Sequence, residues 1–283
     1  MRDPSPRLSS ARADLTRLVE VVDEHGKTQT IAIPAERALT VYVDRRELVT
    51  LMTLGAHPEL LVLGFLRNQR LMDSASQVEA ITVDWEVGAA AVTTRDGIAD
   101  IEAKTAKRVV TTGCGQGSVF GDLMSDVNTI ALAPATLSQQ QLYAIVNTIR
   151  VADSTYKTAG SVHGCALFRG DELLMMVEDV GRHNAIDTIA GWMWLQDAAV
   201  QRGDDKIFYT TGRLTSEMVI KCAQMGVPIV ISRSGITQMG LEVAQNLGLC
   251  AVGRATNRRF LCFSAPQRLL LQPALAQAPL RAA

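Results

Sequence analysis

The stretch Ile207-Phe-Tyr-Thr-Thr-Gly-Arg-Leu-Thr-Ser-Glu-Met-Val-Ile-Lys-Cys-Ala-Gln-Met-Gly-Val-Pro-Ile-Val-Ile-Ser232 decides the fold class of the second half of the chain. It predicts a strand over 207–209, a polar loop, a helix over 216–225 and an apolar strand over 227–232. Two such strands joined by one helix are typical of parallel pairing in an α/β layer. The alternation continues in both directions, with strands predicted over 162–168, 173–177, 250–252 and 259–263 and helices over 185–195 and 238–247.

The first hundred residues follow a different pattern, rich in strands and with a single helix. Pro58 opens that helix, which extends to Asn68, because proline is favoured in the first helical turn. The predicted strands cover 18–22, 28–33, 36–43, 48–53, 78–83 and 89–94, and Gly26 lies in the turn of the first hairpin. This arrangement predicts a roll-like α+β domain.

These patterns divide the chain into four parts. We expect a disordered tail over residues 1–14, a small N-terminal β-rich roll over 15–107, an α/β domain over 108–272 and a loose tail over 273–283. Within the second domain, Ser138 and Gln141 have the spacing of a capping box at the start of a helix.

Composition narrows the functional classes. The 283 residues are 47% apolar and 20% charged, with a formal net charge of −1, which gives no bulk attraction to nucleic acid or to membranes. Five scattered cysteines without a C-x-x-C pair match neither a disulfide framework nor a zinc pattern, and free thiols suit a reducing cytosol. No signal peptide and no membrane-spanning apolar stretch is visible, so a cytoplasmic location is expected.

A glycine-rich loop over residues 111–121 contains one cysteine, Cys114, directly after the β-branched run Val109-Val-Thr-Thr112. A strand that ends in glycines can present a thiol in an open loop. Two other interpretations compete, an ordinary glycine turn and a phosphate-binding loop. The spacing Gly113-x-Gly115-x-Gly117 does not match G-x-G-x-x-G, which disfavours the phosphate loop.

Four polar clusters fall at the ends of predicted strands, where ligands bind in α/β sheets. They cover residues 158–165, 178–184, 211–217 and 253–259. In the first, a lone His163 is more often a hydrogen-bonded structural group than a ligand. In the second, Asn184 could cap a helix, but capping needs neither Arg182 nor His183, so a functional loop is favoured. In the third, Arg213 beside a helix start fits a phosphate as well as it fits a solvated cap.

The fourth cluster, Gly253-Arg-Ala-Thr-Asn-Arg-Arg259, places three arginines around a turn. It suits a pyrophosphate or a nucleotide, and a solvated basic hairpin is the alternative. A protein-ligated metal is not expected, because His163, Cys165 and His183 lack zinc spacing.

These clusters, in this order, resemble the formate dehydrogenase accessory sulfurtransferases, the FdhD/NarQ family. Glu178-Asp-Val-Gly-Arg-His-Asn-Ala185 is the most specific block, and Gly212-Arg213 with Glu217 and Gly226-Val-Pro-Ile-Val-Ile-Ser232 also match. The resemblance extends from about residue 36 to residue 268. It implies a C-terminal domain with a cytidine-deaminase-like α/β layout, although the deaminase motifs H-x-E and P-C-x-x-C do not occur in this chain.

The resemblance also implies a function. Members take sulfur from a cysteine desulfurase as a persulfide and pass it to the molybdenum or tungsten bis(molybdopterin guanine dinucleotide) cofactor of formate dehydrogenase. By position, Cys114 is the implied carrier. The implied cofactor-binding residues are Arg254, Ala255, Thr256, Asn257, Arg258 and Arg259, with Arg213 and Arg182 as further candidates. A homodimer, and contact with the formate dehydrogenase catalytic subunit, are implied in the same way.

The chain departs from the family pattern at two positions. Members typically carry C-x-x-C in the loop, whereas this chain has Cys114-Gly-Gln-Gly117, and Arg254 stands where an aromatic residue is usual. One thiolate suffices to carry a persulfide, but no second thiol in the loop can resolve it as a disulfide. A cofactor-insertion chaperone without sulfur transfer is the second hypothesis. A stand-alone thiol oxidoreductase is disfavoured by the missing C-x-x-C.

Overall fold

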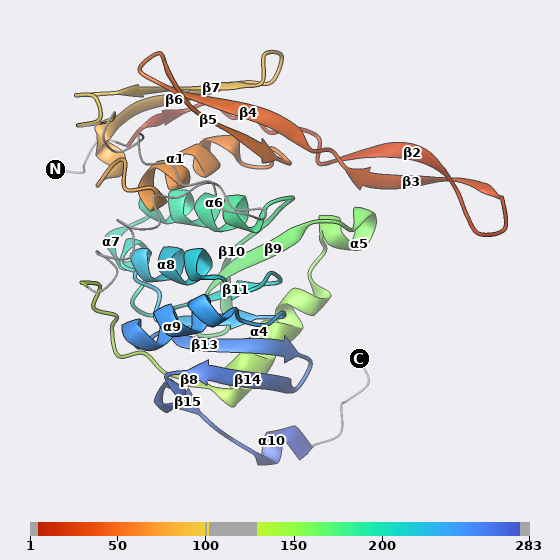
Figure 1. The fold of residues 1–283 in the computed structure, drawn as a ribbon, viewed down its shortest axis with the longest axis vertical. Helices are drawn as coiled ribbons and strands as arrows, with labels where there is room; N and C mark the ends of the chain where they lie inside the picture. Colours follow the sequence, from red (N-terminus) through yellow and green to blue (C-terminus); the bar gives the residue numbers. More distant parts are fainter. Residues whose placement is uncertain (1–4, 100, 102–128, 278–283) are drawn as a thin grey trace. The chain divides into compact units, whose positions relative to one another are not determined.

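The computed structural model describes residues 5–99, 101 and 129–277, which form two compact units (Figure 1). Of the described residues, the first unit contains those up to 101 together with Asp153–Cys165 and Val177–Gln201, and the second contains 129–152, Ala166–Met176 and 202–277. The predicted boundary at residue 107 is therefore wrong, because two segments beyond it pack into the first unit. The result is a mixed α/β fold with several sheets.

A five-stranded sheet organises the first unit, in the order β1-β6-β7-β4-β5. Its strands are β1 (Arg7–Leu8), β4 (Arg37–Val43), β5 (Arg46–Thr53), β6 (Val78–Asp84) and β7 (Ala89–Thr94). The pairs β4–β5 and β6–β7 are antiparallel, whereas β4–β7 and β1–β6 are parallel. The predicted strands 36–43, 48–53, 78–83 and 89–94 are thus confirmed to within two residues.

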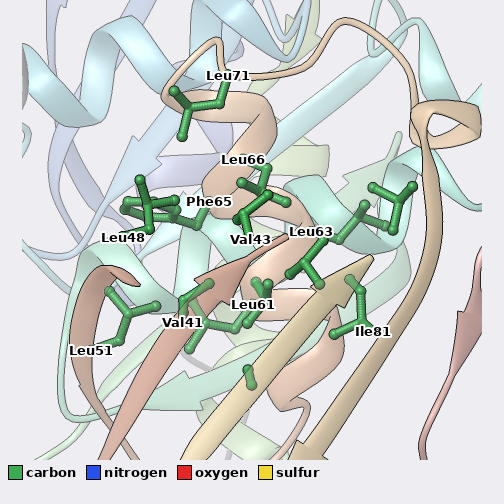
Figure 2. Close-up of a cluster of buried hydrophobic side chains, with 14 of the residues drawn as sticks. Val41, Val43, Leu48, Leu51, Leu61, Leu63, Phe65, Leu66, Leu71 and Ile81 are labelled. Carbon is green, nitrogen blue, oxygen red and sulfur yellow. The ribbon is translucent and has the colours of Figure 1, made fainter. Parts of the chain in front are cut away.

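One face of this sheet is covered by α1 (Pro58–Asn68), which Pro58 opens as predicted. Val41, Leu51 and Ile81 from the strands meet Leu61 and other apolar residues of α1 in one core (Figure 2). These buried strand residues alternate with partly buried or exposed ones, as expected for a sheet with one buried face. The β-rich unit therefore has its own hydrophobic core.

The N-terminal residues and a separate hairpin complete this part of the unit. β2 (Thr16–Val22) and β3 (Thr28–Pro34) form the predicted antiparallel hairpin. The prediction of a disordered tail over residues 1–14 is wrong for its second half. The carboxylate of Glu59 accepts hydrogen bonds from the Ser9 hydroxyl at 2.7 Å and from the Ala11 amide at 2.9 Å, and β1 pairs with β6.

A second helix, α6 (Arg182–Trp194), crosses α1 at backbone contact distance. A Cβ on Gly64 would lie 1.6 Å from the Asp187 carbonyl oxygen, and a Cβ on Gly191 would lie 2.0 Å from the Leu60 carbonyl oxygen. Beside the crossing, the Asn68 side-chain amide donates to the Asp187 carboxylate at 2.7 Å. Only glycine permits this approach, so the two glycines set the distance between the helices.

The short elements of the first unit are η1 (Ala75–Gln77), α5 (Thr155–Ala159) and α7 (Ala198–Gln201). The unit boundary runs through β9 (His163–Arg169) and β10 (Glu172–Asp179). No helix within residues 5–99 and 129–277 has both the length and the apolar character needed to cross a membrane.

A six-stranded sheet organises the second unit, in the order β10-β9-β11-β12-β13-β14. β11 (Lys206–Thr210), β12 (Ile229–Ser232) and β13 (Cys250–Thr256) are parallel, and β14 (Arg259–Ser264) is antiparallel to β13. The parallel pairing predicted from the 207–232 stretch is thus confirmed. A small parallel pair, β8 (Leu137–Ser138) and β15 (Leu269–Leu270), lies apart from this sheet.

Helices α4 (Gln139–Val151), α8 (Ser216–Gln224) and α9 (Gln238–Leu247) belong to the second unit. The predicted capping box of α4 is present, with Ser138 and Gln141 bonded reciprocally. Alternate residues of the parallel strands, among them Ile207, Ile229 and Cys250, share one core with α4. The last elements are η2 (Pro266–Arg268) and α10 (Ala274–Gln277), so the predicted loose tail from residue 273 contains a helical turn.

The helix crossing yields a stability prediction. Gly64→Ala should destabilise the protein by about 3 kcal/mol or more, because the new methyl group meets a backbone carbonyl that cannot rotate away. Urea denaturation at equilibrium measures the change. Gly235→Ala is the control, since a Cβ there has no neighbour within 4 Å, and it should leave the midpoint nearly unchanged. Equal midpoints for both variants would contradict the account of the crossing.

Candidate functional site

Backbone hydrogen bonds join the polar loops that follow β11 and β12 to each other and to the end of β13. The Leu214 amide donates to the Gly235 carbonyl at 2.9 Å, and the Thr237 amide donates to the Leu214 carbonyl at 3.0 Å. The Arg254 amide donates to the Ser234 carbonyl at 2.6 Å. These loops and the end of β13 therefore form one continuous surface at the carboxyl edge of the sheet, where α/β proteins bind ligands.

Two hydroxyl side chains reinforce this edge from below. Ser232 donates to the Gly212 carbonyl at 2.7 Å and accepts from the Ser234 amide at 2.9 Å. The Thr210 hydroxyl accepts from the Gly212 amide at 3.1 Å, and the Thr210 carbonyl accepts from the Arg233 amide at 2.9 Å. Ser232 and Thr210 are fully buried, so their bonds hold the loop backbones without contact with solvent.

The loops after β11 and β12 carry the exposed Arg213 and Arg233, and the exposed Arg254 lies near the end of β13. Within the described residues, no carboxylate forms an ion pair with any of these guanidinium groups. We call these three residues the arginine edge. Guanidinium groups bind phosphate and carboxylate oxygens in two-pronged fashion, so the arginine edge is suited to an anionic ligand.

The start of α8 adds further donors to the arginine edge. Thr215 is the N-cap residue, but its side chain does not bond the first-turn amides of α8, and its buried hydroxyl has no partner among the described residues. In contrast, the Thr237 hydroxyl caps α9 by accepting from the Gly240 amide at 3.2 Å. Uncapped first-turn amides favour an anion. Arg213 lies two residues before the N-cap Thr215.

The predicted segment Arg254–Arg259 forms the end of β13, a turn and the first residue of β14. Ala255 is buried, and Thr256, Asn257 and Arg259 are exposed. Arg254 has a φ of 53° and Asn257 a φ of 51°, both in the left-handed region. Residues other than glycine that have this strained backbone conformation are concentrated at functional sites.

Arg258 is anchored on both sides of the turn. Its carbonyl accepts from the Tyr143 hydroxyl at 2.9 Å, and its Nη1 donates to the Leu275 carbonyl at 3.4 Å. The structure therefore brings the predicted residues Arg213 and Arg254–Arg259 into one unit. Arg233 was not predicted from the sequence, although Ser232-Arg-Ser-Gly235 directly after an apolar strand was a signal for it.

Comparison with known proteins agrees with the sequence resemblance. The family model described as the FdhD/NarQ family matches residues 34–270. The chain belongs to the FdhD/NarQ family. It is 32% identical to the sulfur carrier protein FdhD of Bacillus subtilis over 83% of this chain and 88% of that protein. The FdhD of Geobacillus kaustophilus is 29% identical over 90% of this chain and 93% of that protein.

A solved structure shares the fold. The crystal structure described as a formate dehydrogenase accessory protein from Desulfotalea psychrophila superposes with a TM-score of 0.71. It is 25% identical in sequence and covers 90% of this chain and 98% of its own. The mixed α/β arrangement with several sheets is therefore shared with a second protein over nearly the full length of both.

Cys114, the implied sulfur carrier of this FdhD/NarQ protein, lies outside the described residues. Cys165 is buried in β9, which corresponds to the strand predicted over 162–168. His163 begins the same strand and is partly buried. Within the described part of the chain, no group of three or more His, Cys, Asp or Glu side chains is arranged to hold a metal ion.

The most specific sequence block of the FdhD/NarQ protein, residues 178–185, packs inside the first unit. The Asp179 carboxylate accepts from the Thr53 hydroxyl at 2.5 Å, the Leu54 amide at 3.1 Å, the Gly181 amide at 3.0 Å and the Asn184 side chain at 2.9 Å. These bonds tie β5 to the start of α6. Asp179 and Asn184 therefore have a structural role in this position.

Two expectations for this block change. The N-cap of α6 is Gly181 and not Asn184, because the Asn184 amide turns toward Asp179 and donates to the Met52 carbonyl at 2.6 Å. Arg182, a predicted cofactor ligand, is buried as the first residue of α6 in the first unit, whereas the arginine edge belongs to the second. His183 is buried beside it.

Asp179 yields a pH prediction. Burial raises the pKa of Asp179, and hydrogen bonds from Gly181, Thr53, Asn184 and Leu54 oppose that shift. The folded state then binds the proton more tightly than the unfolded state, so this contribution to stability is present at low pH and lost as pH rises through the folded pKa. As pH rises from about 4, the ordinary pKa of aspartate, the free energy of unfolding of the wild type should fall relative to that of Asp179→Asn.

Urea denaturation of the two proteins at a series of pH values measures this difference. Asp204→Asn is the control, because Asp204 pairs with the exposed Arg202 among the described residues, and an exposed ion pair contributes little to stability. A wild type that gains stability over Asp179→Asn as pH rises would mean that the four donors outweigh burial.

Proposed function

We propose that the protein is a sulfur carrier that takes persulfide sulfur from a cysteine desulfurase onto Cys114. It delivers this sulfur to the molybdenum or tungsten bis(molybdopterin guanine dinucleotide) cofactor, which is its substrate, during maturation of formate dehydrogenase. Membership of the FdhD/NarQ family and the names of the curated relatives support the carrier role. The likeness to a formate dehydrogenase accessory protein supports the target.

The chemistry needs one thiolate from this chain. The Cys114 thiolate attacks the outer sulfur of the desulfurase persulfide, the sulfur–sulfur bond breaks, and the desulfurase thiolate leaves. Cys114 then carries the persulfide. In the second step the sulfur–sulfur bond breaks, the Cys114 thiolate leaves with the bonding pair, and the outer sulfur passes as a neutral atom to the metal of the cofactor, which supplies the two electrons that make it a sulfide ligand. Gly117 replaces the second cysteine of the loop, so no thiol there competes for the carried sulfur as a disulfide partner.

The arginine edge is the observation that supports the proposed binding of the cofactor. The cofactor is rich in phosphate, with a diphosphate in each guanine dinucleotide. Three exposed arginines that have no carboxylate partner among the described residues, beside the uncapped start of α8, fit that charge. Arg254 stands where an aromatic residue is usual, and a guanidinium plane can stack on a guanine ring as an aromatic ring does.

A cofactor-insertion chaperone without sulfur transfer is the alternative. It keeps the arginine edge and gives Cys114 no chemical role. The two functions differ in what Cys114→Ala does, and they agree on what loss of the arginines does. Separate experiments on the cysteine and on the arginines therefore distinguish them.

Sulfur loading tests the carrier role. Incubation with a cysteine desulfurase and cysteine should add one sulfur atom, about 32 Da, to the wild-type chain, because a persulfide adds a single sulfur to a thiol. Cys114→Ala should lose that addition, and Cys222→Ser, which changes a buried cysteine of α8, should keep it. Intact-mass spectrometry before and after reduction reads the result. Equal loading of wild type and Cys114→Ala would favour the chaperone.

Nucleotide affinity tests the binding half. Arg213→Ala, Arg233→Ala and Arg254→Ala should each weaken GDP binding about tenfold to a hundredfold, since a charged hydrogen bond contributes about 1.5–3 kcal/mol. Arg202→Ala is the matched control, because Arg202 is an exposed arginine of the same unit that pairs with Asp204 at 3.3 Å. Isothermal titration calorimetry at fixed salt measures the affinity. Unchanged affinity in all three variants would refute this placement of the nucleotide.

A further inference from the structure

The first unit contains a cavity of about 590 Å³. Three segments of the chain line it: Ser5 near the N-terminus, residues 73–76 at the start of η1, and residues 194–198 with Gln201 at the end of α6 and in α7. All of them belong to the first unit, whereas the arginine edge belongs to the second. The volume lies within the range of about 300–1,000 Å³ that is typical of small-molecule sites.

The lining segment at the start of η1 is held in place by its own side chains. The Gln77 side-chain oxygen accepts hydrogen bonds from the Asp73 amide at 2.7 Å and from the Ser74 amide at 3.0 Å. The Ser74 hydroxyl accepts from the Ser76 amide at 3.2 Å and lies 2.8 Å from the Ser76 hydroxyl. The Asp73 carboxylate itself forms no hydrogen bond or ion pair with the other described residues.

The lining segment between α6 and α7 is fixed in a comparable way. The Gln201 side-chain amide donates to the Gln196 carbonyl at 2.7 Å and to the Trp194 carbonyl at 3.3 Å. The Asp197 Oδ1 atom accepts from two backbone amides of α7, both at 3.0 Å, and its Oδ2 atom bonds to none of the other described residues. Two carboxylates with unused acceptor positions therefore line a cavity whose sides are already ordered.

The charge of the lining favours a cationic ligand. No lysine, arginine or histidine is among the described residues that line the cavity. The Arg67 guanidinium lies over the Trp194 ring, 5.4 Å from its centroid, and donates to the Ala190 carbonyl at 2.9 Å. It thus joins α1 to α6 and forms no ion pair with Asp73 or Asp197. Carboxylates in a recess without a compensating cation attract positive charge and repel phosphate and other anions.

The rest of the lining favours an organic cation over a metal ion. Ca²⁺ and Mg²⁺ need six or more oxygen ligands, and no group of three or more His, Cys, Asp or Glu side chains in the described part of the chain is arranged to hold a metal ion. Trp194, Leu195 and Ala198 give the cavity apolar surface, against which methylene groups can pack. An ammonium group has three donors, and the hydroxyls of Ser74 and Ser76 can accept from it as the carboxylates do.

We propose that this cavity binds a small aliphatic amine in its protonated form. The carboxylates of Asp73 and Asp197 accept hydrogen bonds from its ammonium groups, and the side chains of Trp194 and Leu195 pack against its methylene chain. The cavity and the arginine edge then prefer ligands of opposite charge. This inference is independent of the proposed function, because it uses neither Cys114 nor any residue of the arginine edge.

Calorimetric titration of the full chain with putrescine at pH 7 and low, fixed salt tests the cavity. Both amino groups of putrescine are protonated at this pH, because alkyl ammonium groups have a pKa of about 10. We expect saturable binding to the wild type. Asp73→Asn and Asp197→Asn should each weaken it about fivefold, which corresponds to the loss of one solvent-accessible ion pair. The neutral compound 1,4-butanediol, of similar length, should show no measurable binding.

The substitutions are chosen to leave the fold intact. Asparagine at position 197 keeps the side-chain oxygen that accepts from the α7 amides, and Asp73 has no bond to lose. Asp96→Asn is the matched control, because Asp96 is an exposed aspartate of the same unit that does not line the cavity, and it should leave the affinity unchanged.

Three results would overturn the proposal. The first is the absence of saturable binding to the wild type up to about 10 mM putrescine, which is weaker than the millimolar range of specific small-ligand binding. The second is equal affinity in the wild type and in the double variant Asp73→Asn/Asp197→Asn, which would place the amine elsewhere. The third is equal binding of 1,4-butanediol and putrescine, which would mean that the positive charge is not recognised.

Discussion

The crossing of α1 and α6 is the constraint on which the first unit depends. Carbonyl oxygens of Asp187 and Leu60 occupy the positions that Cβ atoms would take on Gly64 and Gly191, so the helices meet through their backbones. That contact places α6 against the β-rich sheet's own helix, although more than a hundred residues separate them in sequence. Asp179, just before α6, can then receive the Thr53 hydroxyl and the Leu54 amide at the end of β5. The most specific family block, residues 178–185, therefore connects the start of α6 to the end of β5, which is distant in sequence.

The second unit uses backbone contacts in the same way, but at its ligand-facing edge. A Cβ on Gly253 would lie 2.8 Å from the Phe263 ring and 3.1 Å from the Ser234 carbonyl, and one on Gly240 would lie 2.5 Å from the Leu214 carbonyl. Together with the hydrogen bonds between them, these approaches fix three backbone segments relative to one another. The backbone holds these segments, and the side chains of Arg213, Arg233 and Arg254 form no hydrogen bond or ion pair with other described residues. A binding surface built on a rigid support in this way needs little reorganisation when a ligand arrives.

Local patterns in the sequence predicted most of the elements, and long-range contacts explain what it did not predict. Apolar periodicity, Pro58 and the Ser138–Gln141 capping box are readable within one turn or one strand, and the structure has them. The assignment of residues 177–201 to the first unit depends on Gly64 and Gly191, which no local signal connects. Asn184 has the composition of an N-cap, but a distant partner, the Met52 carbonyl, takes its amide. The sequence did not predict Arg233 as a site residue, because it lies outside the polar clusters 211–217 and 253–259 that contain the other arginines.

The energetics of the arginine edge favour a ligand over a structural explanation. An exposed arginine that pairs with a carboxylate contributes little to stability, and one without a partner contributes less. Three like charges on backbone segments joined by hydrogen bonds repel one another, and no ion pair with another described residue offsets the repulsion among Arg213, Arg233 and Arg254. The left-handed backbone of Arg254 adds a further cost. Glutamine or serine would fill the same exposed positions without repulsion. Unlike glutamine and serine, arginine has a charged planar guanidinium group, whose donors match phosphate oxygens in two-pronged fashion.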